Sequence, residues 1–304
     1  MLIAIDHGNK QIKTAHKTYT AGFCVSDTRP PFGKDVLFYK DRYYTLSDQR
    51  IPYMRDKTKD ERYFILTLFA IAFELREQGY TTNEVADVQL SVGLPPAHYG
   101  AQYESFEKYF VNRDIVDFQL DDQPFSVFIS QAVCFPQAYA AAMPVYQKIA
   151  QYPKTVVVDI GGFTADYLLI KKGQADLSVC DSLENGVIVL YNRIISKVNA
   201  DLDMLLDESD IDTILLEQQG EYDETVCRIV EEQAQLFVED LFGKLRERMI
   251  DLRSGKAVFV GGGSILLRRQ IEKSSKVGSA LFLDSISANT RGYELLYQAS
   301  VMEK

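Results

Sequence analysis

The sequence has few of the residues that build disulfide frameworks and zinc sites. Its 304 residues include four cysteines and three histidines. The cysteines lie far apart and form no C-x-x-C pair, and the histidines do not cluster, so no structural zinc site is expected. We expect free thiols in a reducing cytoplasm.

Long apolar runs and an excess of basic charge are also missing. The most apolar run, residues 64–73, is too short to span a membrane. No basic segment followed by an apolar one opens the sequence, which argues against a signal peptide. The formal net charge of -10 argues against a large basic surface for nucleic acid. Residues 201–224 hold ten carboxylates and no lysine or arginine. We interpret them as a solvated helical face, with a partner-binding surface as the alternative.

Glycine-containing turns follow three apolar strands. They occur in residues 3–10 (IAIDHGNK), 156–166 (VVVDIGGFTAD) and 258–264 (VFVGGGS). Glycine has no Cβ, so backbone N–H groups at such turns can approach a polyphosphate. The pattern G-x-x-x-x-G-K-[ST] does not occur, which excludes a P-loop. The three turns predict two similar half-molecules that close on a nucleotide.

Charged residues accompany the first two turns. Asp6 and Asp159 end their strands, and two carboxylates beside phosphates are suited to hold Mg²⁺ through waters. Asp166 is placed to orient water or another ligand of the metal. Lys13, on the return strand, is placed to reach a β- or γ-phosphate as a point charge. Each residue alone also fits a purely structural role, and the joint arrangement favours a function. His7 is expected to be exposed.

The order of predicted strands and helices indicates two α/β domains that share one cleft. We expect domain I over residues 1–150 and domain II over residues 151–288. Domain I is expected to include a small β subdomain at about 19–60 and to receive the C-terminal helix 289–304. Domain II is expected to include a helical subdomain at about 195–252. Other predicted helices span residues 59–78, 101–110, 131–149 (starting near Pro136), 185–198 and much of 209–252, broken near Gly220.

These motifs resemble those of the actin-like ATPases, which include actin, the heat-shock chaperone ATPases and sugar kinases. The first two turns resemble the two phosphate motifs, and the third resembles the adenosine motif. Residues 135–141 (FPQAYAA) and 288–292 (ANTRG) resemble the two connecting helices. The resemblance covers the full chain and implies the actin-like (ribonuclease H-like) fold, with two related α/β domains flanking a nucleotide cleft.

Within this superfamily, the chain is most similar to ParM-type bacterial plasmid-segregation actins. The similarity rests on the spacing D-x-G-x-x-x-x-K at residues 6–13, on residues 181–187 (DSLENGV) and on the chain length. It implies metal binding by Asp6, Asp159 and Asp166. It implies nucleotide binding by Gly8, Asn9, Lys13, Gly161, Gly162, Thr164, Gly186, Glu231, Gly261, Gly262, Gly263 and Ser264.

The resemblance also implies catalytic roles for Asp6, Asp159 and Gln137. Gln137 stands where ParM-type proteins and chaperones carry a glutamate that positions the attacking water. A glutamine can orient water but is not a base at neutral pH. Gln131 also resembles part of the actin motif, so the sequence leaves open which glutamine faces the γ-phosphate.

The implied function is that of an ATPase that polymerises with ATP (or GTP) and Mg²⁺, and whose slow hydrolysis triggers disassembly. ParM-type filaments move plasmid DNA in the bacterial cytoplasm through a DNA-binding adaptor, without direct contact to nucleic acid or membrane. Two rival readings are a monomeric actin-fold kinase or phosphotransferase and a nucleotide-binding scaffold that does not hydrolyse. The aromatic-rich residues 32–53, including Arg50, are expected to form part of a subunit interface, and the alternative is a locally packed small subdomain.

Overall fold

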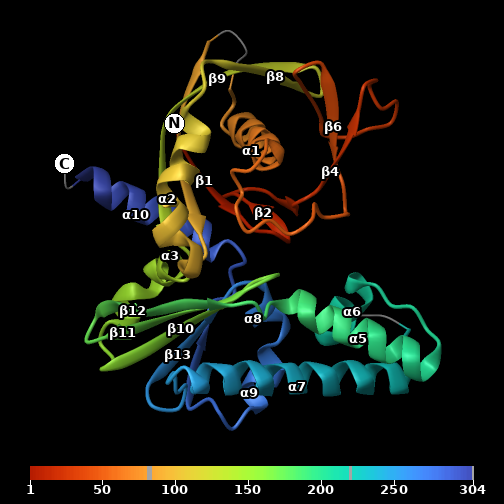
Figure 1. Cartoon of the computed structure of the whole chain (residues 1–304), viewed down its shortest axis with the longest axis vertical. Coiled ribbons are helices and arrows are strands. Elements are labelled where there is room, and N and C mark those ends of the chain that lie inside the picture. The colour runs from red at the N-terminus through yellow and green to blue at the C-terminus, as the bar shows by residue number, and fades with distance from the viewer. Residues whose placement is uncertain (81–83, 219–220, 303–304) are drawn as a thin grey trace. The chain divides into compact units, whose positions relative to one another are not determined.

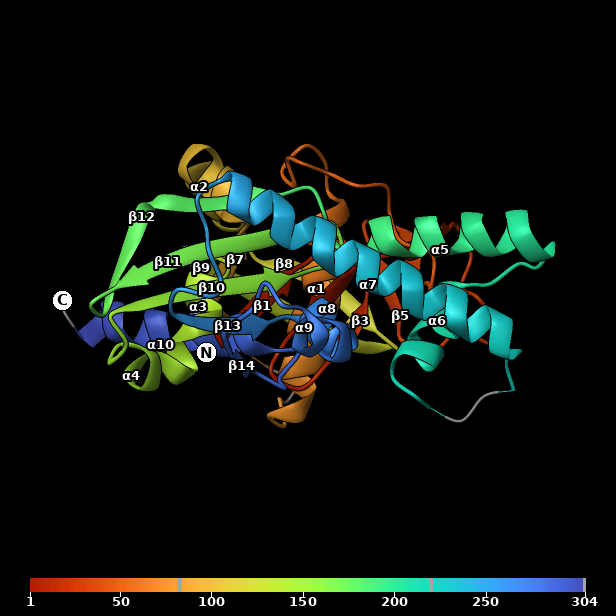
Figure 2. The ribbon, with the colours of Figure 1, turned by 90° about the horizontal axis from the view of Figure 1, so that it is seen from below.

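The computed structural model describes residues 1–80, 84–218 and 221–302 (Figures 1 and 2). The chain separates into two compact units, here called unit 1 (Met1–Pro144 with Ser287–Lys304) and unit 2 (Val145–Ile286). The predicted helix break near Gly220 and the last two residues of the predicted helix 289–304 lie outside the described residues. No described helix has the length and apolar character needed to cross a membrane.

Unit 1 is built on a nine-stranded sheet in the order β3-β2-β1-β7-β9-β8-β5-β6-β4. Strand β1 pairs in parallel with β7, and β7 with β9, whereas β1, β2 and β3 are joined antiparallel. The pairing of β5 with β8 joins the strands of residues 23–46 to the same sheet. The strands are β1 (Leu2–His7), β2 (Gln11–Lys13), β3 (Thr18–Thr20), β4 (Phe23–Ser26), β5 (Val36–Tyr39), β6 (Arg42–Leu46), β7 (Ala86–Leu94), β8 (Val116–Leu120) and β9 (Gln123–Pro136).

Helix α1 (Arg62–Glu77) lies inside the curve of this sheet (Figure 1). Every residue from Tyr63 to Leu75 is buried, which exceeds the single apolar stripe of a surface helix. The helix ends at Gly79, whose positive φ of 72° closes the last turn through a hydrogen bond from Tyr80 N to Leu75 O at 2.9 Å. The predicted helix 59–78 is thus present, with its stop at the expected glycine.

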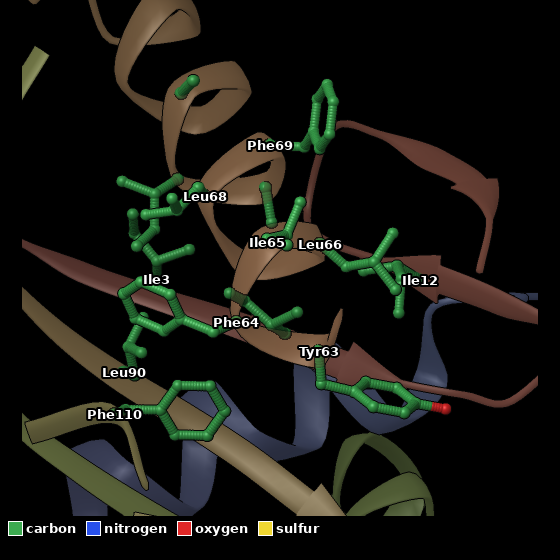
Figure 3. Close-up of a cluster of buried hydrophobic side chains, with 14 of the residues drawn as sticks. Ile3, Ile12, Tyr63, Phe64, Ile65, Leu66, Leu68, Phe69, Leu90 and Phe110 are labelled. Carbon is green, nitrogen blue, oxygen red and sulfur yellow. The ribbon is translucent and has the colours of Figure 1, made fainter. Parts of the chain in front are cut away.

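Alternate residues of β1 face opposite layers of unit 1. Ile3 and Ile5 pack into the core that α1 shares with α2 (Pro96–Val111). Ala4 packs on the other face against α3 (Tyr139–Ala142) and α10 (Ala288–Met302). Figure 3 shows side chains of the first layer, among them Ile3, Leu90, Phe64 and Phe110. By the same alternation, His7 faces the α1 layer and Asp6 faces the α3 layer.

Unit 2 contains a five-stranded sheet in the order β12-β11-β10-β13-β14. Strand β10 pairs antiparallel with β11 and in parallel with β13, and β13 pairs in parallel with β14. Strands β3-β2-β1-β7-β9 of unit 1 have the same order and the same directions. The expected repetition of one α/β plan in two halves is therefore confirmed. The strands are β10 (Lys154–Ile160), β11 (Ala165–Lys171), β12 (Gln174–Leu183), β13 (Lys256–Val260) and β14 (Ser279–Phe282).

The helices of unit 2 bury one face of this sheet and continue past its end. The layer formed by α5, α6 and α7 extends beyond the strands in both views (Figures 1 and 2). Valine, leucine, isoleucine and phenylalanine side chains from these helices form one core with the strands. The helices are α4 (Tyr146–Ile149), α5 (Val187–Leu202), α6 (Glu208–Leu215), α7 (Glu224–Glu247), α8 (Gly262–Leu266) and α9 (Arg268–Lys273).

The predicted helix over residues 131–149 is wrong. Strand β9 continues through Gln131 to Pro136, and its buried residues alternate with more exposed ones, as in a strand rather than a helix. Helical structure begins only at Tyr139. It is divided into α3 and α4 by the 3-10 turn Met143–Val145, which contains Pro144.

Candidate functional site

The first glycine turn places a carboxylate and a lysine side by side in unit 1. Asp6, 5% exposed, lies near the end of β1, and Lys13 of β2 is its direct partner in the antiparallel register. Directly opposed residues share one face of the sheet, with Cβ atoms about 5 Å apart. Gly8 and Asn9 form the turn between the two strands. The predicted grouping of these four residues is therefore present.

Gln137 lies against Asp6. Its Nε2 donates a hydrogen bond to Asp6 Oδ1 at 2.8 Å, and both side chains are buried. Gln131 lies elsewhere: it pairs with Gln89 of β7, level with Leu2 at the start of β1. The structure therefore brings Gln137, and not Gln131, to the first glycine turn.

A strained turn follows Gln137. Ala138 is buried, with φ 59° and ψ -48°, and Tyr139 N donates to Gln137 O at 2.6 Å. These values describe the rare γ-turn with positive φ, which costs about 1–3 kcal/mol outside glycine. Such strain persists only where the surroundings enforce it. The turn fixes the direction in which Gln137 leaves the end of β9.

The expectation that His7 is exposed is wrong. The side chain is fully buried, and its Nε2 lies 2.8 Å from Thr67 Oγ1 of α1. Its ring packs against Phe110 at 5.3 Å and Phe106 at 5.5 Å between ring centroids. Burial, with a smaller contribution from the charge of Lys57, holds the pKa of His7 well below its usual value. His7 is therefore a neutral part of the core beneath the turn.

Lys57 is a contributor to the first turn that sequence reasoning missed. It is 3% exposed, its Nζ donates to the carbonyl oxygen of His7, and it lies 5.3 Å from the ring centroid of Tyr63. The Tyr63 hydroxyl donates to Asn9 Oδ1 at 2.7 Å, and Met54 N donates to the same oxygen at 3.3 Å. The turn is thus held from below by residues of α1 and of the segment before it.

His7 predicts a loss of stability in acid. Its folded-state pKa is lowered, so the unfolded chain takes up a proton first as the pH falls below about 6.5. Between about pH 7.5 and about pH 5.5, this linkage removes up to about 1.4 kcal/mol of unfolding free energy. His7→Phe removes this linkage. We therefore expect its free energy of unfolding, measured with urea at both pH values, to fall by up to about 1.4 kcal/mol less than that of wild type.

His16 provides the matched control of opposite sign. Its Nδ1 lies 2.7 Å from Glu74 Oε2, and this hydrogen bond raises the pKa of His16. A raised pKa stabilises the fold below the unfolded-state pKa, and this contribution is lost as the pH rises. His16→Asn should therefore lose more unfolding free energy than wild type between the same two pH values. An acid loss in His7→Phe equal to that of wild type would contradict the assignment.

The second turn, in unit 2, places two carboxylates opposite each other. Asp159 of β10 and Asp166 of β11 are direct partners in the antiparallel register. Both are buried, at 5% and 3% exposure. Carboxylate oxygens are ligands that Mg²⁺ prefers, so two carboxylates on one face of neighbouring strands form a candidate cation site.

The loop of the second turn interlocks with the start of α5. Gly161 N donates to Thr164 O at 2.8 Å, which closes the turn around Gly162 and Phe163. Gly186 N donates to Phe163 O at 3.0 Å, and a Cβ at Gly186 would lie 2.2 Å from the carbonyl oxygen of Gly162. Only glycine permits this approach, so Gly186 belongs structurally to the second turn.

The third turn meets the second at Asp159. Gly261 adopts φ 85° and ψ 162°, a conformation essentially restricted to glycine. A Cβ there would lie 2.2 Å from Asp159 Oδ1. Gly262 and Gly263 open α8, and Ser264 follows with a buried hydroxyl that has no hydrogen-bond partner in the described part of the chain. A buried hydroxyl of this kind suits a bound polar ligand.

Glu231 lies on α7, where it contacts α9. Its carboxylate accepts hydrogen bonds from Arg269 and, at 2.8 Å, from Gln270 Nε2. Arg269 also contacts Glu217 at the end of α6. Glu231 therefore has a structural role in joining helices, beside the nucleotide-binding role that the sequence implies.

The predicted metal ligands are divided between the units. Asp6 lies in unit 1, and Asp159 and Asp166 lie in unit 2. Across residues 1–80, 84–218 and 221–302, no three His, Cys, Asp or Glu side chains are gathered as a metal site. Mg²⁺ is commonly held by one or two carboxylates together with substrate phosphates and waters. The Asp159–Asp166 pair fits that mode of binding.

Comparison with known proteins identifies the architecture. The sequence model of the family described as "Actin like proteins N terminal domain" matches residues 32–139. The one described as "Archaeal actin homologue MreB-like, C-terminal" matches residues 157–273. A search of curated proteins found no match.

Solved structures of actin homologues share the fold over almost the full chain. Ta0583, an archaeal actin homolog, is 19% identical over 98% of this chain and 99% of its own, with a TM-score of 0.74. The ParM of a 15-stranded filament from Clostridium botulinum is 17% identical over 98% and 99%, with a TM-score of 0.75. The apo pSK41 ParM is 16% identical over 99% and 98%, with a TM-score of 0.70. The two halves of the chain thus match sequence models of actin-like families, and its fold is that of solved actin homologues, ParM proteins among them.

Proposed function

We propose that this chain is an actin-like ATPase that polymerises into filaments when it binds ATP. The main support is the repeated device: in each unit the first strand of the shared sheet plan ends in an aspartate and a glycine turn. Turns of this kind bind phosphate through backbone N–H groups. Ta0583 has been solved with ADP, and Bacillus thuringiensis ParM with ATP.

Different turns would bind different parts of the nucleotide. In unit 1, the Gly8–Asn9 turn and the Lys13 ammonium would bind phosphate oxygens. In unit 2, Gly161, Gly162 and Thr164 would bind the same phosphates through their own turn, which Gly186 supports. The third turn, Gly261 to Gly263, would hold the nucleoside with Ser264, whose buried hydroxyl would gain a partner. Glu231 would contact the nucleoside from α7.

A divalent cation would be held by Asp159 and Asp166, with Asp6 as the ligand from unit 1. Mg²⁺, when bound, supplies charge neutralisation on the phosphate oxygens. The chain's own contribution is to hold the carboxylates in fixed positions. Lys13 opposite Asp6 and the glycine turn beside Asp159 serve that end.

Hydrolysis would proceed by in-line attack of water on the γ-phosphate. The amide nitrogen of Gln137 is committed to Asp6, and its amide oxygen would accept a hydrogen bond from the attacking water. An amide orients water without removing its proton, so we expect slow turnover. Slow hydrolysis lets assembly precede the weakening of the filament.

The biological role that fits this chemistry is the segregation of plasmid DNA in the bacterial cytoplasm. The structural neighbours include a ParM described as a filament. A formal net charge of -10 fits an indirect contact with DNA through a DNA-binding adaptor protein rather than a basic DNA-binding surface. The filament of identical subunits and this adaptor are the proposed partners.

One observation favours a second candidate, a filament or scaffold that binds nucleotide without hydrolysing it. A glutamine, rather than a carboxylate that could act as a base, lies beside Asp6. The two candidates differ in a single measurable quantity, the release of phosphate.

Sedimentation with parallel phosphate detection tests the proposal. Purified protein with Mg²⁺ and ATP, GTP, ADP or no nucleotide is centrifuged over a range of concentrations. We expect pelleting with a triphosphate, followed by a decrease in the pellet as phosphate appears, and the preferred base is read from the two triphosphate arms. Stable pelleting without phosphate release supports the scaffold. Protein that stays in the supernatant under every condition contradicts a filament and favours a monomeric kinase or phosphotransferase.

A further inference from the structure

The two ends of the helical layer of unit 2 carry opposite charge. The acidic end is residues 201–208, within the segment that holds ten carboxylates and no basic residue. The basic end comprises the exposed side chains of Arg246, Arg248, Met249 and Arg253, together with Lys154, whose Nζ donates to Ser254 Oγ at 2.8 Å. Glu247 and Asp251, which lies 3.7 Å from Arg253 Nε, are interspersed, so the four basic side chains outnumber two acidic ones.

Helix α7 separates these two ends. It has 24 residues, a length of about 36 Å. Asn185 accepts a hydrogen bond from Lys244, and Arg193 forms an ion pair with Asp240, so α5 runs antiparallel to α7. The end of α5 therefore lies beside the start of α7, as both views show (Figures 1 and 2). The acidic end lies at the start of α7, and the basic end begins in its last turn.

Each charged end presents an exposed apolar side chain. Leu205 is 81% exposed at the acidic end, beside the partly exposed Leu202 and Met204. Met249 is 87% exposed at the basic end. The dipole of α7 favours acids at its start and bases at its end, so it accounts for some of the charge. It does not account for the apolar side chains that each end exposes to water.

Both apolar side chains are held on fixed turns. Leu205 precedes the buried Leu206 and the capping box of α6, in which Asp210 N donates to Asp207 Oδ1 at 2.9 Å. Met249 adopts φ 62°, and its N donates to Arg246 O at 2.9 Å. Surfaces ordered in advance lose little conformational entropy on binding, which suits them to specific contacts.

We propose that the acidic end of one subunit docks on the basic end of a second copy of this chain. The two ends are complementary in charge, and each offers an apolar residue to bury. They lie at opposite ends of one helical layer, so they cannot satisfy each other within a subunit. A contact between two different patches of identical subunits is heterologous, and it generates an open filament when the rotation between subunits does not close a ring. This inference rests on the proposed filament function and names the surfaces that would form its longitudinal contact.

Two single substitutions and one control test the contact. Leu205→Lys places a cation at the acidic end, and Met249→Asp places an anion at the basic end, with a residue that tolerates positive φ. We expect each to raise the concentration needed for triphosphate-dependent pelleting by at least about tenfold. Leu236→Lys is the control. Like Leu205→Lys, it replaces an exposed leucine by lysine, but Leu236 is a 59% exposed residue of α7 away from both ends. This variant should pellet like wild type.

Mixing the two variants gives the decisive result. Each retains one intact end, so an equimolar mixture should form dimers in analytical ultracentrifugation, while neither variant alone does. An unfolded variant would not complement the other, so dimer formation also shows that both are folded. A mixture that stays monomeric overturns the pairing, as does normal pelleting of either single variant.

The wild-type protein separates failure of this inference from failure of the proposed function. Wild-type pelleting together with normal pelleting of the variants overturns only the assignment of these surfaces. Wild-type protein that never pellets overturns both the filament and the contact. Loss of pelleting in Arg50→Glu, with Leu205→Lys and Met249→Asp unaffected, would place the interface at residues 32–53 and would also overturn the pairing.

Discussion

Gly261→Ala should destabilise unit 2 by about 2–5 kcal/mol and weaken nucleotide binding at least about tenfold. Two effects add at this position. The backbone conformation, φ 85° and ψ 162°, is essentially restricted to glycine. The new Cβ would also lie 2.2 Å from Asp159 Oδ1 and 2.8 Å from Ile160 O, so the third turn and the Asp159 carboxylate cannot both keep their places.

The expected loss is measured by urea unfolding and by titration with a fluorescent ATP analogue. Stability and binding should fall together, because the substitution displaces a proposed metal ligand as well as the backbone. Any nucleotide binding that remains would be binding to a protein in which Asp159 has moved. Adding Mg²⁺ should therefore raise the nucleotide affinity of Gly261→Ala by a smaller factor than it raises that of wild type.

Gly262→Ala is the matched control for stability. A Cβ at Gly262 meets no atom within 4 Å, and the residue begins α8. Alanine in a helical conformation removes freedom from the unfolded chain, so we expect a stability within about 0.5 kcal/mol of wild type, or slightly higher. If Gly261→Ala and Gly262→Ala unfold at the same urea concentration, the close contact between Gly261 and Asp159 is not as described.

The features that sequence reasoning predicted correctly are those that short segments determine. An apolar strand, an aspartate and a glycine turn are local, so the segments around Asp6 and Asp159 could be predicted without knowing their neighbours. Gly79 ends α1 through its own positive φ, which is also a local property. The repeated sheet plan followed because the same local pattern occurs twice.

The errors concern residues whose environment is set by distant segments. His7 is polar and sits in a turn, yet aromatic rings of α2, about 100 residues away, bury it. Lys57 belongs to a polar stretch and gives no signal of its 3% exposure. Its position depends on how the segment before α1 passes beneath the first turn.

The segment around Gln137 shows why residue spacing alone was insufficient. Its small residues favour a helix, and β9 nevertheless extends to Pro136 because the sheet supplies a parallel partner in β7. The γ-turn at Ala138 has a sequence that gives no reason to expect positive φ. Tertiary contacts impose that turn, and the same contacts bring the glutamine amide to Asp6.

Gln137→Ala should lower the rate of phosphate release by about 100-fold while leaving nucleotide binding nearly unchanged. The amide is placed to orient water, whereas Gly8, Asn9 and Lys13 would bind the phosphate oxygens. Filaments of this variant should therefore assemble at the wild-type concentration and persist for longer. Phosphate release and the decay of the pellet, followed in one reaction with ATP, measure both effects.

Gln131→Ala separates this role from a general effect of losing a glutamine from the same segment. Gln131 accepts a hydrogen bond from the Tyr297 hydroxyl at 2.7 Å and is level with the start of β1, not its end. Its loss should leave phosphate release within about twofold of wild type, since it removes one partly exposed hydrogen bond. Equal slowing in both variants would mean that the amide beside Asp6 does not orient the water. Because Gln137 donates to a carboxylate already opposed by Lys13, its removal should change the position of water more than the charge of the first turn.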